Sequence, residues 1–84
     1  MSYRVEIVPS AEREFKRLPI QLQTRLRPKL IALEDNPRPR GTKRLKETDR
    51  YRLRVGDYRV IYSIDDGQRL VRILAIKHRR ESYR

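Results

Sequence analysis

Residues 51–62 read YRLRVGDYRVIY, two runs in which apolar or aromatic residues alternate with arginines on either side of Gly56-Asp57. Successive side chains of a strand point to opposite faces, so each run predicts a strand with one apolar face and one cationic face. The Gly-Asp pair is typical of a tight hairpin turn that joins two antiparallel strands. Because guanidinium groups bind phosphate through paired hydrogen bonds, this cationic face indicates a phosphate-containing ligand.

The rest of the chain predicts two helices and several more strands. Residues 3–8 alternate as a strand would, and Ser10 is the expected N-cap of a helix over 10–18. A second helix is expected over 22–33, where leucines recur four, four and three residues apart, with a kink at Pro28. The remaining strands are predicted at 43–47, 50–55, 58–65 and 69–77.

These elements predict one α+β domain spanning residues 1–84, in which an N-terminal strand and a two-helix hairpin precede an antiparallel meander. The apolar stripes of the helices need a surface to cover, so both helices are expected on the apolar face of the sheet. Residues expected on that covered face are Val5, Ile7, Leu53, Val60, Tyr62, Ile73 and Ala75.

Charge indicates the class of partner. The formal net charge is +11, of which residues 1–37 carry +2 and residues 38–84 carry +9. A field of this size attracts polyanions, and it is concentrated in the strand-forming half of the chain. An acidic protein would satisfy the same field as a nucleic acid.

Composition excludes several kinds of site. The chain has no cysteine, and its three glycines stand apart as turn residues, so thiol chemistry and a glycine-rich phosphate loop are excluded. The carboxylates are scattered, with Asp65-Asp66 in a predicted turn, so no metal site and no cofactor are expected. No apolar run is long enough to span a membrane and no signal peptide is visible, so a cytoplasmic protein is expected.

The residues that remain are a cluster of cationic side chains and a terminal tyrosine, and RNA can be cleaved without a metal when its own 2′-hydroxyl attacks the adjacent phosphate. That reaction needs a proton acceptor, cationic stabilisation of the phosphorane and a proton donor for the leaving oxygen. Arginine suits the second task but not the first, because guanidinium keeps its proton. His78 is the only histidine, which excludes a two-histidine pair within one chain but leaves His78 as a possible proton carrier.

The whole chain resembles the RelE/ParE toxin superfamily, and within it the RelE-type mRNA interferases. The resemblance rests on the helical hairpin ending in Asn36-Pro37, the basic segment through Leu45, residues 51–62, and the terminal run His78-Arg79-Arg80-Glu81-Ser82-Tyr83. It implies a curved sheet with the helices on one face and mRNA bound on the concave side. It also implies ribosome-dependent cleavage of mRNA in the 30S decoding site, and neutralisation by a RelB-like antitoxin.

The resemblance also assigns roles by position. Arg52 and Arg54 match two basic residues of the catalytic strand, Arg54 standing where the family's proposed general base is lysine. Arg59 matches the arginine that stabilises the transition state, Arg79 one that protonates the leaving group or contacts phosphate, and Tyr83 a tyrosine that orients the substrate. The residues expected to bind RNA are Lys43, Arg44, Lys46 and Arg80.

Three alternatives stay open. A ParE-like protein would share the scaffold but inhibit DNA gyrase, and a basic RNA-binding or ribosome-binding module would bind without cutting. Some relatives use a glutamate–histidine pair, for which Glu47 with His78 is the candidate here. An acidic antitoxin segment is expected to cover the helices or the cationic face, with Ile20 as a possible contact.

Overall fold

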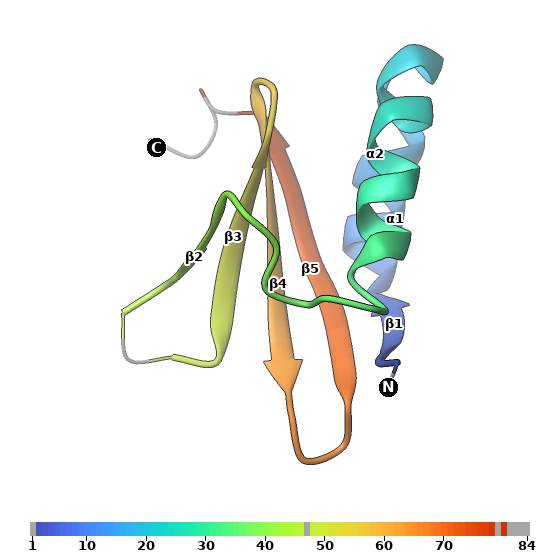
Figure 1. Ribbon diagram of the computed structural model, residues 1–84. Coiled ribbons are helices and arrows are strands. Elements are labelled where there is room, and N and C mark those ends of the chain that lie inside the picture. Colours follow the sequence, from blue (N-terminus) through green and yellow to red (C-terminus); the bar gives the residue numbers. More distant parts are fainter. Residues whose placement is uncertain (1, 47, 79, 81–84) are drawn as a thin grey trace.

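The computed structural model describes residues 2–46, 48–78 and 80 (Figure 1). Along the chain the elements are β1 (Arg4–Ile7), α1 (Pro9–Lys16), α2 (Ile20–Ala32), β2 (Thr42–Arg44), β3 (Arg50–Val55), β4 (Tyr58–Asp65) and β5 (Leu70–His78). The five strands form one sheet in the order β1-β5-β4-β3-β2. The predicted antiparallel meander is confirmed, because β2, β3, β4 and β5 each pair with the next strand in antiparallel fashion. The N-terminal strand β1 lies beside the last strand, β5, and runs parallel to it.

Both helices pack on one face of the sheet, as predicted (Figure 1). Leu26 and Leu33 of the second helical segment and Ala11 of α1 are fully buried against the sheet. Each large apolar side chain buried in this way stabilises the fold by roughly 1.5–3 kcal/mol. Of the predicted core residues, Leu53, Val60, Tyr62 and Ile73 are buried, and Val5 and Ile7 pack at the edge of the same cluster.

The prediction for Ala75 was wrong because β5 contains a bulge. The register passes from Ile61 opposite Ala75 to Tyr62 opposite Ile73, which leaves Leu74 as an extra residue. One extra residue reverses the alternation of side chains along the rest of the strand. Ile76 is therefore buried beneath the helices, while Ala75 turns to the other face and is only half-buried.

Several element boundaries also differ from the predictions. Ser10 does not cap α1: the helix begins at Pro9, whose fixed φ suits the first helical position, and Val8 is the residue before it. The second helix begins at Ile20, before the predicted start at Leu22, and it continues through Pro28 as one element, as predicted. The strand predicted over 43–47 is only three residues long, because Thr48 donates a backbone hydrogen bond to the carbonyl of Leu45 and turns the chain.

Candidate nucleic-acid interface

The outer face of β2, β3 and β4 carries the predicted cationic cluster. Lys43 lies opposite Arg52, and Arg54 lies opposite Arg59, in the antiparallel register of these strands. Together with Gly41 and Thr42, these four side chains line a concavity of about 310 Å³, which we call the arginine pocket. The sheet therefore brings Arg52, Arg54, Arg59 and Lys43 together, as the alternation of residues 51–62 predicted.

The arginine pocket is strongly cationic. Arg52 and Arg59 are half-buried, whereas Lys43 and Arg54 are exposed. Among the described residues, no carboxylate lines the pocket. Four positive charges around one concavity repel one another unless an anion lies between them. Guanidinium groups from neighbouring strands can each donate two hydrogen bonds to phosphate oxygens, so this arrangement is chemically able to bind phosphate.

A buried tyrosine places β2 beside β3. Tyr62 is fully buried, and its hydroxyl donates to the carbonyl oxygen of Pro37 at 2.7 Å and lies 3.2 Å from Oγ1 of Thr42. Burial raises the pKa of Tyr62, which keeps the hydroxyl protonated as a donor. Gly41, at φ +93°, then turns the chain into β2. Lys43 reaches the arginine pocket because of these contacts.

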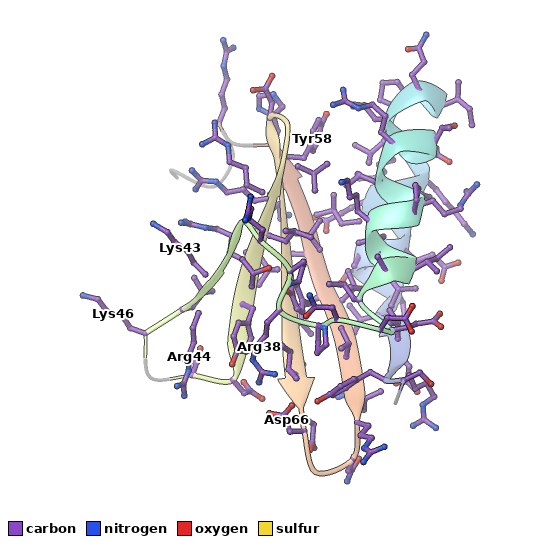
Figure 2. All side chains as sticks on the ribbon, viewed as in Figure 1. Arg38, Lys43, Arg44, Lys46, Tyr58 and Asp66 are labelled. Carbon is purple, nitrogen blue, oxygen red and sulfur yellow. The ribbon has the colours of Figure 1, made fainter. Side chains whose placement is uncertain are left out.

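A second polar cluster surrounds a single arginine, Arg38, which has a carboxylate partner. The guanidinium of Arg38 donates to both carboxylate oxygens of Asp66, at 3.2 and 2.8 Å, and to the hydroxyl of Tyr51 at 3.2–3.3 Å (Figure 2). The Tyr3 hydroxyl donates to the same carboxylate at 2.6 Å. Hydrogen bonds from Arg38 lower the pKa of Asp66, and the bond to Asp66 raises the pKas of Arg38 and Tyr3. Sequence analysis missed Arg38, because its partner lies 28 residues away.

The structure does not bring His78 to the arginine pocket. The bulge in β5 turns its side chain to the helix-covered face, where its ring meets that of Tyr58 edge-on at 5.1 Å between centroids. There it lines a separate concavity of about 370 Å³ together with Leu22 and Arg25 of α2. His78 and the four cations of the arginine pocket thus lie on opposite faces of the sheet.

The other predicted residues are dispersed. The Nε of Arg44 donates to the carbonyl of Thr48 at 2.9 Å, and Lys46 lies exposed in the turn beyond β2 (Figure 2). Arg80 is exposed, with its backbone N–H 3.2 Å from Nδ1 of His78. Arg79, Tyr83 and Glu47 lie outside the described residues.

Two further features concern the described part of the chain alone. No group of three or more His, Cys, Asp or Glu side chains there is placed to hold a metal ion. No helix within it has the length and apolar character needed to cross a membrane.

The sequence is similar to known toxins. The sequence profile of the ParE toxin of the type II toxin–antitoxin system parDE matches residues 5–83. The chain is 36% identical to Toxin RelE of Mycobacterium tuberculosis over 84 residues, which cover 98% of this chain and 87% of that toxin. The chain belongs to the RelE/ParE toxin family. It is a toxin of the RelE type.

Solved structures of RelE toxins share its fold. The structure of this toxin matches the archaeal RelE–RelB complex from Pyrococcus horikoshii OT3 with a TM-score of 0.86 and 36% identity, over 94% of this chain and 97% of that one. It matches the toxin–antitoxin complex RelBE2 from Mycobacterium tuberculosis with a TM-score of 0.80 and 28% identity, over 93% and 99% of the two chains. The toxin therefore has the RelE fold throughout its described core.

Proposed function

We propose that this RelE-type toxin is an endoribonuclease that cleaves translated mRNA in the 30S decoding site and thereby inhibits translation in the cytoplasm. The observation that carries the proposal is the arginine pocket, where Arg52, Arg54, Arg59 and Lys43 converge and no described carboxylate intervenes. The family's toxin role and the resemblance of residues 51–62 to the catalytic strands of mRNA interferases support it.

The proposed reaction is an attack by the 2′-hydroxyl of the RNA on its own neighbouring phosphate. The bond from O2′ to phosphorus forms, the bond from phosphorus to O5′ breaks, and the products are a 2′,3′-cyclic phosphate and a 5′-hydroxyl. Negative charge accumulates on the non-bridging oxygens in the transition state, and preorganised cations stabilise it there. Arg59 is assigned to this task because it matches the family's transition-state arginine and is half-buried on β4, the central strand of the sheet, with Arg52 and Arg54 binding the phosphate.

One proton must leave the 2′-hydroxyl and one must reach O5′. Guanidinium groups keep their protons, whereas the neutral form of a lysine can accept one and its ammonium can donate one. Lys43 is the lysine that faces the arginine pocket, so it is a candidate for proton transfer beside its expected role in RNA binding. Arg79 and Tyr83 remain proposed contributors through the resemblance alone.

Dependence on the ribosome has a physical rationale in this pocket. Among the described residues, the lining holds neither a carboxylate nor an imidazole, the side chains that most readily accept a proton near neutral pH. Alignment of the 2′-oxygen with the scissile bond must then supply much of the acceleration. A ribosome that holds the mRNA strand in a bent, extended form would supply that alignment.

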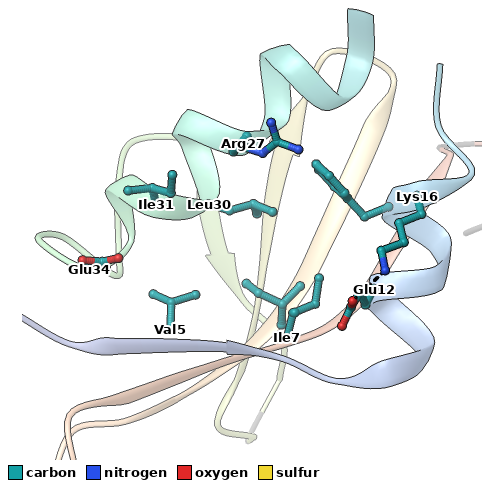
Figure 3. Close-up of a pocket in the computed structure, with 10 residues that line it drawn as sticks. Val5, Ile7, Glu12, Lys16, Arg27, Leu30, Ile31 and Glu34 are labelled. Carbon is teal, nitrogen blue, oxygen red and sulfur yellow. Dashed lines mark ion pairs between the residues drawn. The ribbon is translucent and has the colours of Figure 1, made fainter. Parts of the chain in front are cut away.

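We further propose that a RelB-like antitoxin neutralises the toxin, using the groove between α1, α2 and β1 (Figure 3). The groove measures about 430 Å³, and Val5, Ile7, Leu30 and Ile31 give it an apolar surface. Ile31 is 54% exposed, which leaves apolar area for a partner to cover. The net charge of +11 favours an acidic partner, and solved relatives occur as RelE–RelB complexes.

Primer extension on a defined mRNA in a purified translation system tests the nuclease. Wild type, Arg59→Ala and Arg72→Ala are compared with and without ribosomes; Arg72 is the matched control, an arginine on the outer face of β5 beyond the pocket. Cuts are expected only with ribosomes, in wild type and Arg72→Ala but not in Arg59→Ala. Folded wild type that makes no cut, yet inhibits DNA supercoiling by gyrase, would favour the ParE-like alternative instead.

A further inference from the structure

A second cationic concavity lies on the other side of β3, between that strand and α2. It measures about 400 Å³, and Arg25, Lys29, Arg40 and Arg54 contribute positive charges to its wall. We call it the helix-side pocket. No described carboxylate lines it, and Ala32, Pro39, Leu53 and Val55 supply the apolar part of its surface.

The two cationic pockets share one lining residue. Arg54 lines both the arginine pocket and the helix-side pocket. Strand β2 pairs with β3 only as far as Leu53, opposite Thr42, so β2 does not separate the pockets at Arg54. On the far side, Arg25 of α2 reaches the β3–β4 turn, since a Cβ at Gly56 would lie 3.9 Å from its Nη2.

The described residues offer no ion-pair partner to three cations of the helix-side pocket. Arg25 and Lys29 stand four residues apart on α2, where like charges repel across one helical turn. Both are exposed, as is Arg40, and the ion pairs formed among the described residues include none of the three. In contrast, Lys16 pairs with Glu12 on α1, and Arg38 pairs with Asp66. A cluster without such compensation indicates an anion from outside the chain.

We propose that the helix-side pocket binds a second phosphate of the RNA strand whose scissile phosphate lies in the arginine pocket. The strand then bends around the end of β3, with Arg54 between its two phosphates. This inference rests on the proposed function, because it takes the strand in the arginine pocket to be RNA. Its ligand chemistry is the phosphodiester backbone, which is read without regard to base sequence.

Fluorescence anisotropy with labelled single-stranded RNA tests the second pocket. Both probes carry 2′-fluoro groups in place of the attacking hydroxyl. The long probe has about 12 nucleotides, so that it can occupy both pockets, and the short probe has about 4, so that it tests the arginine pocket alone. Wild type is compared with Arg25→Gln/Lys29→Gln and with Arg13→Gln/Arg17→Gln. The last variant loses the same charge from exposed positions of α1 and its neighbouring turn, away from both pockets.

The helix-side variant is expected to bind the long probe about tenfold more weakly, with the slope of log affinity against log salt reduced by about 0.7 for each phosphate that the variant no longer binds. Its affinity for the short probe should equal that of the α1 control, because the arginine pocket is intact. Thermal unfolding should show no loss of stability, since removing the Arg25–Lys29 repulsion favours the helix.

Two outcomes would overturn the inference. Equal losses in the helix-side and α1 variants on both probes would mean that only the overall field matters. Normal RNA binding with weaker binding of the antitoxin would mean that an acidic protein segment occupies the pocket. A failure of the proposed function would look different. If wild type cut no mRNA on ribosomes while the helix-side variant still bound the long probe more weakly, the nuclease proposal would be wrong and the second phosphate site would stand.

Discussion

The arginine pocket and the cluster around Arg38 differ in whether a described carboxylate lies beside the guanidinium groups. In the arginine pocket, Arg52, Arg54 and Arg59 share a concavity that no described carboxylate enters. At the other end of the sheet, Arg38 is held by Asp66 and by the hydroxyl of Tyr51. The described residues thus set a carboxylate against Arg38 and none into the lining of the arginine pocket. An arginine that donates to a carboxylate of its own chain stabilises the fold, and we propose that the arginines of the pocket bind phosphate.

Paired alanine substitutions test this comparison most directly. Arg59→Ala is expected to reduce ribosome-dependent cleavage about 100- to 1,000-fold, because it removes preorganised charge from the transition state. Its unfolding midpoint in urea should stay near that of wild type. Arg38→Ala should leave cleavage near that of wild type and should lower the urea midpoint, because the Asp66 carboxylate loses its main donor. If Arg38→Ala abolished cleavage without loss of stability, the distinction between the two clusters would fail.

Tyr62→Phe sharpens the comparison by loosening the segment that links the clusters. The substitution removes a buried hydroxyl that donates to Pro37 and contacts Thr42, leaving the carbonyl of Pro37 without that donor. We expect a loss of about 1–2 kcal/mol in the free energy of unfolding. Cleavage should also fall, by less than in Arg59→Ala, because Lys43 follows Thr42 into the arginine pocket. A variant with lowered stability and unchanged cleavage would show that β2 keeps its place without this contact.

The smallest expected effect concerns how the unfolding temperature falls as the pH is lowered into the acid range. Hydrogen bonds from Arg38 and Tyr3 lower the pKa of Asp66, so this carboxylate stabilises the fold above its unfolded pKa. That contribution is lost as pH falls through the lowered folded-state pKa. The unfolding temperature of wild type should therefore exceed that of Asp66→Asn near neutral pH, and the two should converge below about pH 4. A difference that persisted unchanged into acid would mean that the carboxylate charge is not what stabilises this end of the sheet.

Sequence patterns anticipated the arginine pocket because it depends on local rules. The alternation along residues 51–62 and the short Gly56-Asp57 turn place the arginines on one face and fix the register of two neighbouring strands. Similarly, the leucines of α2, which recur at helical spacing, predicted which face of this helix packs on the sheet. Neither inference needed contacts between distant parts of the chain.

Other features could not be read from local patterns. The bulge at Leu74 arises where β5 pairs with β4, inside the continuous apolar run Ile73-Leu74-Ala75-Ile76, where the sequence does not show which residues face the helices. Its consequence reaches both Ala75, which leaves the core, and His78, which turns away from the arginines. The partnership of Arg38 with Asp66 and the helix-side pocket likewise join segments that are remote in sequence.

The sequence by itself determined the α+β order of elements, the cationic outer face and the arginines that share it, because strand alternation and helical periodicity are properties of neighbouring residues. Only the tertiary structure decided which cations find a carboxylate and which line a concavity that can receive an anion. That outcome depends on strand register and on the path of residues 36–42 across the sheet, where the buried hydroxyl of Tyr62 holds Pro37. Distant pairing, which no local pattern encodes, separates the cluster proposed to bind phosphate from the cluster around Arg38.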